Sequence, residues 1–332
     1  MQIGDAPDDR QTEPATRLAL AQHAEDAWAV AVLKVLFPDA DLIRTRDMAR
    51  IDGADFAIDV GGIWDPASGR FDHHQKEFDG ARSSGVPYAS AGLVWKEYGA
   101  RCVAALAERH TGQQISDDTA QQIAYAIDAD VVQYLDLSDV GVARSAPGSY
   151  GLSAVVSGFN LGWMDEQRLG SGEAVEAQRM AQFMRAVEFL TDIMSNAVRY
   201  RVGAILAVSQ VRSAEVMEDG RVLFLKNAAL PWSSVVRKEM PKVLFVISYS
   251  ILENRHILHT VSVDAESFDA RADLPASWAG LRDADLAAVT GVPDAVFCHT
   301  GRFIAAARSY EGIRIMARQA LDAVDAEARQ AS

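Results

Sequence analysis

Two stretches, Ile58-Asp59-Val60-Gly61-Gly62 and Phe71-Asp72-His73-His74-Gln75, decide how the rest of this sequence is interpreted. The first has the pattern of an apolar strand that ends in a carboxylate and a glycine turn. The second adds another carboxylate and two adjacent imidazoles. Oxygen and imidazole ligands in this mixture suit Mn²⁺, Zn²⁺ or Fe²⁺. Together the two stretches predict a metal centre of the kind that hydrolyses phosphate esters.

The surrounding residues alternate between strand and helix patterns. Short strands and one alanine-rich helix are expected, in chain order, at 16–21, 24–37, 41–46 and 55–60. This order predicts a mostly parallel α/β sheet, and such folds bind ligands at the carboxyl edge of the sheet. The turn sequence Asp-Pro-Ala-Ser-Gly at 65–69 would reverse the chain. Asp72, His73 and His74 would then return to the sheet edge that carries Asp59.

Helical periodicity dominates the middle of the chain and gives way to an α+β pattern. Helices are expected at 89–109, from a Ser116 cap to about Tyr134, and at 173–207. A helix as long as the last one usually joins two domains. Strands and a final helix are then expected at 221–226, 242–250, 256–263, 294–298 and from about 309 onward. The predicted parts are an N-terminal domain, a connecting helix and a smaller α+β domain, at 1–165, 166–207 and 208–332.

Composition limits the partners. With 332 residues, 49% of them hydrophobic and 23% charged, the chain is expected to form two soluble domains. A net charge of −14 excludes binding of long duplex DNA by charge neutralisation. Only Cys102 and Cys298 are present, so a reducing compartment and buried thiols are expected. With neither a signal peptide pattern nor a membrane-length apolar run, the sequence predicts a cytoplasmic protein.

Two further groups of residues could complete the metal centre. His23 and Glu25 flank a single residue at the first strand-to-helix turn. Asp128 lies on an otherwise apolar helical face and would need a cation partner if buried. Each candidate also has an ordinary structural interpretation. Asp59 could stabilise a turn, the paired histidines could lie exposed in a hairpin, Asp128 could face water, and His23 could cap a helix.

These motifs resemble the melanocyte-proliferating-gene-one family of the DHH phosphoesterase superfamily over almost the whole chain. The matching stretches are 23–29, 44–47, 59–62, 71–75, 90–93, 127–129, 274–275, 278–282, 299–303 and 311–312. The resemblance implies a DHH phosphoesterase domain with a mostly parallel sheet and a C-terminal domain that binds substrate. It also implies one or two divalent ions, Mn²⁺ by preference, and 3′-to-5′ exonuclease activity on short single-stranded RNA.

Site residues follow from the same resemblance. Asp59 matches the carboxylate that bridges the two ions, and His74 matches a contact to the substrate phosphate. The implied metal ligands are His23, Glu25, Asp59, His73 and Asp128, and the implied catalytic residues are Asp59, Asp72, His73 and His74. Cationic candidates for the substrate phosphates are Arg44, Arg46, His299, Arg302 and Arg308, which could equally serve surface solubility.

The sequence departs from the family in two places. Leu18 stands where the family has a histidine, and Ala305-Ala306 stand where it has two glycines. These departures leave open a second interpretation, a catalytically weakened or inactive relative that binds a nucleotide. The acidic charge leaves open a third, a phosphoesterase for a small molecule such as a dinucleotide. A homo-oligomer is compatible with all three.

Overall fold

The computed structural model describes residues 16–20, 26–141, 151–266 and 269–331. The chain divides into two compact units, one ending at Val202 and the other beginning at Gly203. The long helix α8 (Gly172–Arg212) contributes residues to both units. The division therefore falls inside the helix that the sequence predicts as a connection.

The described part of the N-terminal unit contains a five-stranded sheet in the order β2-β1-β3-β5-β4. Its neighbouring strands are parallel except for the pair β5 and β4. The strands are β1 (Arg17–Leu20), β2 (Asp41–Arg44), β3 (Phe56–Ile58), β4 (Trp64–Asp65) and β5 (Arg70–Phe71). The short 3₁₀ helix η1 (Pro66–Ser68) connects β4 to β5 and contains the predicted turn. The predicted mostly parallel sheet is confirmed.

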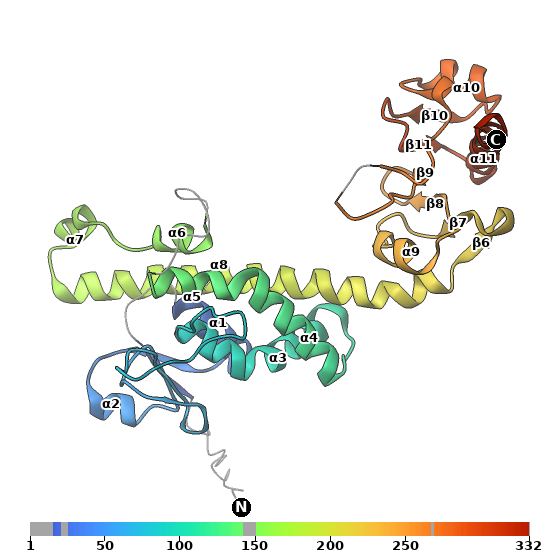
Figure 1. Cartoon of the computed structure of the whole chain (residues 1–332). Helices are drawn as coiled ribbons and strands as arrows, with labels where there is room; N and C mark the ends of the chain where they lie inside the picture. Colours follow the sequence, from blue (N-terminus) through green and yellow to red (C-terminus); the bar gives the residue numbers. More distant parts are fainter. Residues whose placement is uncertain (1–15, 21–25, 142–150, 267–268, 332) are drawn as a thin grey trace, which may run out of the picture. The chain divides into compact units, whose positions relative to one another are not determined.

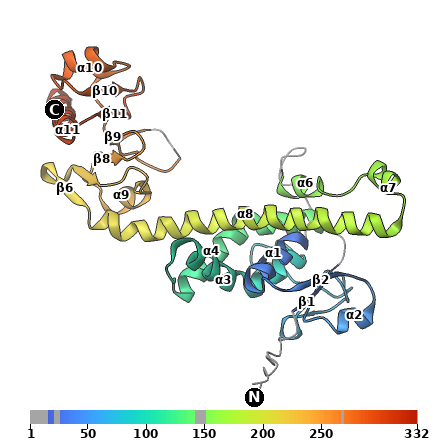
Figure 2. The same ribbon diagram turned by 180° about the vertical axis from the view of Figure 1, so that it is seen from behind.

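Helices cover this sheet. Helix α1 (Asp26–Leu36) is buried on nearly every side, as expected for a helix that is apolar all round. It packs on α3 (Ser90–Thr111), where the rings of Trp28 and Trp95 meet edge to face with centroids 5.6 Å apart. Helix α2 (Met48–Asp52) places Ile51 in a separate cluster with Ala19 and Ala57 of the strands. In Figures 1 and 2 the layer of α1 and α3 lies between the sheet and α8.

The helical region after α3 differs from the predicted pattern in one detail. The helices among its described residues are α4 (Asp117–Ile127), the π-helical turn η2 (Asp128–Val132), α5 (Gln133–Asp139), α6 (Leu152–Ser157) and α7 (Trp163–Leu169). The helix predicted to end near Tyr134 continues to Asp139, because the π turn carries the chain on without ending it. Helix α8 packs on α3 through the buried pair Met194 and Cys102, whose sulfur atoms are 3.3 Å apart.

Within the described residues of the C-terminal unit, six strands form one sheet in the order β10-β11-β9-β8-β7-β6. Strands β7 and β8 are parallel and the other neighbours are antiparallel. The elements are β6 (Glu215–Met217), η4 (Glu218–Gly220), β7 (Val222–Leu225), α9 (Ser233–Glu239), β8 (Phe245–Ser250), β9 (Arg255–Thr260), η5 (Ala276–Trp278), α10 (Asp283–Thr290), β10 (Ala295–Cys298), β11 (Ile304–Ala307) and α11 (Tyr310–Ala331). Helix α11 packs with Phe245, Leu258 and Ala305 in one core. Helix α9 contributes to a second core with Leu223 and Val246.

The predicted smaller α+β unit is confirmed by this sheet and its helices. The expected boundaries at 165 and 207, and a substrate-binding role for 208–332, stay predictions. Both cysteines are buried free thiols, as expected. Among the helices that the structure describes, none combines the length and apolar character needed to cross a membrane.

Candidate metal centre

Asp59 follows the last residue of β3 and occupies an unusual backbone conformation. Its φ of +57° lies in the left-handed region, which aspartate tolerates better than most residues. Its N–H donates to the carbonyl of Phe71 at 3.0 Å, which fixes it beside the end of β5. Its carboxylate is buried and accepts a hydrogen bond from Ser90 Oγ at 3.2 Å. The carboxylate is therefore held at the carboxyl edge of the sheet, as predicted.

Asp72 directly follows β5 and orients its neighbour His74. The Asp72 carboxylate accepts from the N–H of Gly62 at 2.7 Å and from the N–H of His74 at 3.0 Å. The Nδ1 atom of His74 lies 2.9 Å from the same carboxylate. Burial alone would raise the pKa of Asp72, but these hydrogen bonds hold it below its ordinary value. An ionised Asp72 keeps the Nδ1 proton on His74 and fixes the orientation of the ring.

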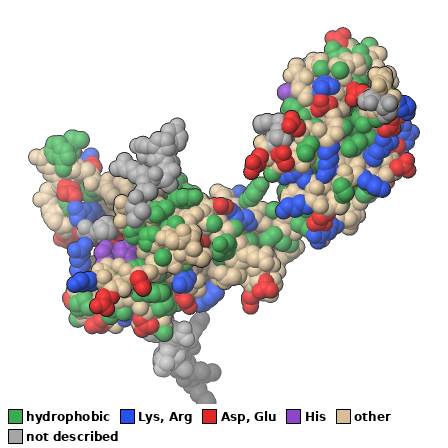
Figure 3. Space-filling view, viewed as in Figure 1, with side chains coloured by type: hydrophobic (Ala, Val, Ile, Leu, Met, Phe, Trp, Pro, Cys, Tyr) green, Lys and Arg blue, Asp and Glu red, His purple; other side chains and the backbone are tan. Residues whose placement is uncertain are grey.

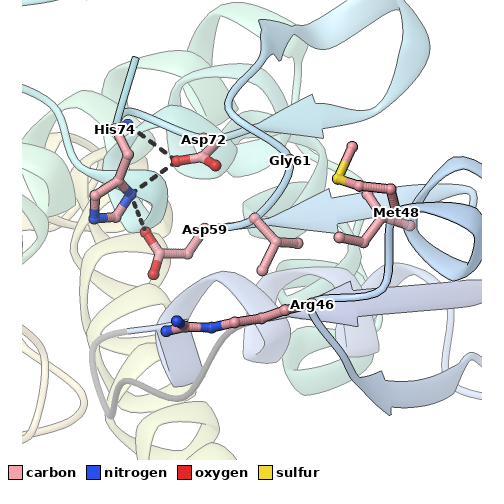
Figure 4. A pocket seen from close by; sticks show the side chains of 8 residues that line it. Arg46, Met48, Asp59, Gly61, Asp72 and His74 are labelled. Carbon is pink, nitrogen blue, oxygen red and sulfur yellow. Dashed lines mark hydrogen bonds and ion pairs between the residues drawn. The ribbon is translucent and has the colours of Figure 1, made fainter. Parts of the chain in front are cut away.

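The predicted residues Asp59, His73 and His74 come together. One ligand atom from each lies within 4.8 Å of the other two. Oδ1 of Asp59 is 3.3 Å from Nδ1 of His74 and 3.9 Å from Nε2 of His73. The two imidazole rings lie side by side with centroids 4.3 Å apart. Figure 4 shows Asp59, Asp72 and His74 directed toward one another at the ends of their strands.

Asp139 joins this cluster although the sequence analysis did not select it. It is the last residue of α5, and its Oδ2 lies 3.5 Å from Nε2 of His73. A signal was present in the sequence. Val132, Asp136 and Asp139 repeat at helical spacing, so Asp139 lies on the same helical face as two buried residues, beyond the point where the predicted helix ends.

The structure places Asp128 in a different set of contacts. Both of its carboxylate oxygens accept from Arg82, Oδ2 from Nε and Oδ1 from Nη2, each at 2.7 Å. The expected cation partner exists, but it is an arginine side chain. Asp128 therefore does not join Asp59 and His73 in the cluster.

The chemistry of the cluster fits a divalent cation. Burial, with the nearby carboxylates of Asp139 and Asp72, raises the pKa of Asp59, whereas His74 and His73 oppose that rise. A cation bound between these groups would stabilise the ionised carboxylate. Asp59, His73 and Asp139 supply the mixed oxygen and imidazole ligands that Mn²⁺, Zn²⁺ or Fe²⁺ accept.

A pocket of about 300 Å³ opens beside the cluster. Asp59, Asp72 and His74 line one part of it, and Arg46 and Met48 line another. Figure 4 shows the guanidinium of Arg46 extending along the pocket toward Asp59. Figure 3 shows histidine side chains at the surface of the N-terminal unit, next to basic side chains. The pocket thus combines a candidate metal centre with a cation available to an anionic substrate.

Arg44 belongs to another pocket, although it is close to Arg46 in sequence. It pairs with Glu176 of α8 at 3.1 Å and lines a cavity of about 480 Å³ with Arg50 and Glu173. Burial lowers the pKa of Arg44. The two arginines predicted to contact the same phosphates therefore line separate pockets. His23 and Glu25 lie outside the described residues.

The three predicted substrate residues of the C-terminal unit lie around β11. His299 and Arg302 share the loop before this strand, where His299 Nδ1 accepts the N–H of Gly301 at 3.0 Å. Arg302 pairs with Asp273. Arg308 follows the strand at its other end. The structure therefore groups His299 with Arg302 and separates both from Arg308.

Both departures from the family pattern lie in buried strands. Leu18 is fully buried within β1 and pairs with Phe56, three residues before Asp59. Ala305 and Ala306 are fully buried within β11. A histidine at position 18 would thus lie in the core and not at the sheet edge, and the alanine methyl groups do not reach the protein surface.

An α/β unit with paired carboxylates and imidazoles at the carboxyl edge of its parallel strands defines the class of metal-dependent hydrolases. A model of the MYG1 exonuclease family, described as "Uncharacterised protein family (UPF0160)", matches residues 21–321. The chain belongs to this family, which confirms the resemblance.

Curated relatives extend along most of the chain. The MYG1 exonuclease of Homo sapiens is 28% identical over 321 residues, covering 90% of this chain and 83% of its own length. A MYG1 protein of Caenorhabditis elegans is 28% identical over 327 residues, covering 90% and 92%.

Solved structures show weaker likeness. A pGpG-specific phosphodiesterase, PggH from Vibrio cholrae, is 13% identical, with a TM-score of 0.25 and coverage of 94% of this chain and 99% of its own. RecJ of Thermus thermophilus in complex with Mn²⁺ is 12% identical, with a TM-score of 0.25 and coverage of 92% and 52%. Likeness at these scores supports no inference about the site.

Proposed function

We propose that this chain is a metal-dependent phosphoesterase that removes nucleotides from short single-stranded RNA in the 3′-to-5′ direction. Membership in a family whose curated relatives carry the name exonuclease makes it a hydrolytic enzyme of the nuclease or phosphodiesterase class. The observation that carries the proposal is the convergence of Asp59, His73 and His74 beside a pocket containing Arg46, with Asp139 3.5 Å from His73.

Each residue of the pocket has a role in this proposal. Asp59, His73 and Asp139 hold the metal, together with His23 and Glu25 as the family resemblance implies. When bound, divalent ions lower the pKa of water and neutralise charge on the phosphate. Arg46 offers a guanidinium fork to the phosphate oxygens. The pKa of His74 is raised, because its hydrogen bond to Asp72 and nearby carboxylates outweigh burial. His74 therefore stays protonated to higher pH and donates a hydrogen bond to the phosphate.

The test uses one short RNA labelled at either its 5′ or its 3′ end, incubated with purified protein and Mn²⁺. Removal of nucleotides from the 3′ end gives a ladder of shortened products from the 5′-labelled strand and releases labelled mononucleotide from the 3′-labelled one. The Arg46→Met variant should lose most of this activity and bind RNA more weakly. Arg50→Met, a change at an exposed arginine of α2, is the matched control and should remain active. The reverse pattern of labels would refute the polarity.

The size of the pocket favours one alternative substrate class. A volume of about 300 Å³ is at the lower end for ligand sites and suits one nucleotide better than a longer segment. A dinucleotide could therefore be cleaved as well as RNA. A panel of dinucleotides, short RNA and short DNA separates the two. Preference for dinucleotides would replace the RNA proposal, and inactivity on the whole panel with Mn²⁺ would identify a binding protein.

A further inference from the structure

A buried arginine outside the candidate metal centre is not explained by substrate binding. Only 7% of the Arg82 side chain is exposed. Its Nε and Nη2 atoms donate to Asp128, and Nη2 also lies 2.8 Å from Oδ2 of Asp136. Its Nη1 donates to the carbonyl of Pro87 at 3.2 Å, and the Tyr88 ring lies 4.2 Å from the guanidinium. All three guanidinium nitrogens are thus used within the protein.

The two carboxylates held by Arg82 lie on opposite sides of the π-helical turn η2. Asp128 is its first residue, and Asp136 lies in the following helix α5. A π turn changes the rotational position of every residue after it, and such turns occur often at functional sites. Because one guanidinium binds both carboxylates, it fixes the direction in which α5 leaves the turn.

The beginning of α3 fits closely around this arrangement. Oδ1 of Asp136 accepts the N–H of Gly92 at 2.9 Å. A Cβ atom added at Gly92 would lie only 1.9 Å from Oδ2 of Asp136 and 2.7 Å from Nη2 of Arg82. Any side chain at this position would therefore displace the ion pair. Ser90, in the same turn of α3, donates to Asp59.

Helix α5 connects this arrangement to the metal centre. Asp139 follows Asp136 by one helical turn, and its Oδ2 lies 3.5 Å from Nε2 of His73. We propose that Arg82 is a positioning residue that holds Asp128 and Asp136 together across the π turn and thereby sets Asp139 against His73. This inference rests on the proposed metal centre. It assigns a role in building that centre to Arg82, a residue that does not belong to the cluster itself.

The test is the Arg82→Lys variant. Lysine keeps one positive charge between the carboxylates but cannot reproduce the planar fork. We expect faster hydrogen exchange in the α5 amides of the metal-free protein and a rise of about tenfold in the Kd for Mn²⁺, the scale seen for residues that orient metal ligands. Loss of global stability alone leaves that Kd unchanged while the protein stays folded during the titration.

The matched control is Arg201→Lys. Arg201 pairs with Asp130 of the same π turn, but on an exposed face. It should leave both the exchange of α5 and the Kd unchanged. If Arg82→Lys does not fold, Asp136→Asn keeps the pair of Arg82 with Asp128 and should shift both measurements in the same direction, by less.

The outcomes separate this inference from the proposed function. Suppose that the wild type binds Mn²⁺. If Arg82→Lys then leaves either the hydrogen exchange of α5 or the Kd for Mn²⁺ unchanged, the role of Arg82 is overturned and the metal centre is not. A wild type that binds no divalent ion would overturn the metal centre, and the role of Arg82 with it.

Discussion

The carboxylate of Asp59 has two properties that raise its pKa in the metal-free protein. It is buried, which raises its pKa, and it lies among other carboxylates. The same properties make it a strong ligand once a cation compensates the negative charge. Its contribution to metal binding and its contribution to stability should therefore have opposite signs.

The Asp59→Asn substitution tests this point because it removes the charge and keeps the shape. We expect the Kd for Mn²⁺ to rise more than about 100-fold, beyond the effect of outer residues, and hydrolysis to be lost. The melting temperature of the metal-free protein should stay the same or increase. Asp52→Asn, at an exposed aspartate of α2, is the control and should change neither property. An Asp59→Asn enzyme with wild-type activity would refute the metal centre.

Leu18 tests whether a missing histidine can be restored. Since Leu18 is fully buried within β1, Leu18→His should destabilise the protein by about 2 kcal/mol or more, through lost burial and an unpaired polar group. Leu18→Met conserves volume and should lower stability by less than about 1.5 kcal/mol. Urea unfolding measures the difference between the two variants. A gain of bound metal in Leu18→His without loss of stability would contradict the position described here.

The grouping of the central site residues could be predicted from the sequence because Asp59 and Asp72 directly follow short strands and the two histidines come immediately after Asp72. Asp59, Asp72, His73 and His74 are fixed by strand ends, which are local features. The position of Asp139 depends on the rotation of α5, which is set by contacts with Arg82 far away in sequence. The helical spacing of Val132, Asp136 and Asp139 indicates that they share a face of the helix, but a sequence pattern does not report the direction in which that face points.

At the scale of elements, the region from α4 to α5 shows where apolar periodicity no longer predicts which residues share a helix face. Apolar spacing predicts a helix there, and a helix is present. The π turn η2 inserts an extra residue into the helical repeat, so a stripe extrapolated from α4 does not continue into α5. Asp128, which precedes the extra residue and falls on the apolar stripe of α4, pairs with Arg82, whereas Asp139, which follows it, reaches His73.

Asp136, in helix α5, makes the stability of the protein depend on pH. Burial raises its pKa to about 7, although Arg82 and the N–H of Gly92 oppose the rise. Between the ordinary aspartate pKa and about 7 the folded protein binds more protons than the unfolded chain, so stability falls as pH rises, by at most about 1.4 kcal/mol per unit. Asp136→Asn cannot titrate. Thermal unfolding of both proteins without metal, from pH 5 to 8, should show the wild type losing stability relative to the variant. A constant difference would contradict the shift.

At the scale of the molecule, two units with separate cores could be predicted, and their division falls inside the long helix that the sequence predicts at 173–207. Helix α8 continues through the division without a break, so no change of composition marks it. The sequence does not predict strand β11, because Ile304-Ala305-Ala306-Ala307 is poor in strand-forming residues. Its place between β9 and β10 buries all three alanines, and this tertiary context decides the conformation.

The separate cores predict how the functions divide. All candidate metal ligands precede Val202, so a fragment of residues 1–202 should bind Mn²⁺ with the Kd of the full chain. It should lose most hydrolysis of RNA if 208–332 bind the substrate, as the family resemblance implies. Calorimetric titration and the end-labelled RNA assay measure the two properties. A folded fragment that binds no Mn²⁺ would show that the C-terminal unit contributes a ligand.

The register of β3 and β5 limits how this chain can change its length. Ile58 pairs with Phe71 as the last pair of these two parallel strands. Asp59 and Asp72, the next residues, therefore leave the two strands at the same level. An extra residue between Phe71 and Asp72 would move the following carboxylate and both histidines to the wrong side of the sheet. An extra residue between Ala67 and Ser68, in an exposed turn, would leave the ladder intact. Insertions and deletions should therefore be tolerated before β5, in the exposed turn, and not directly after it, although the two places are only a few residues apart.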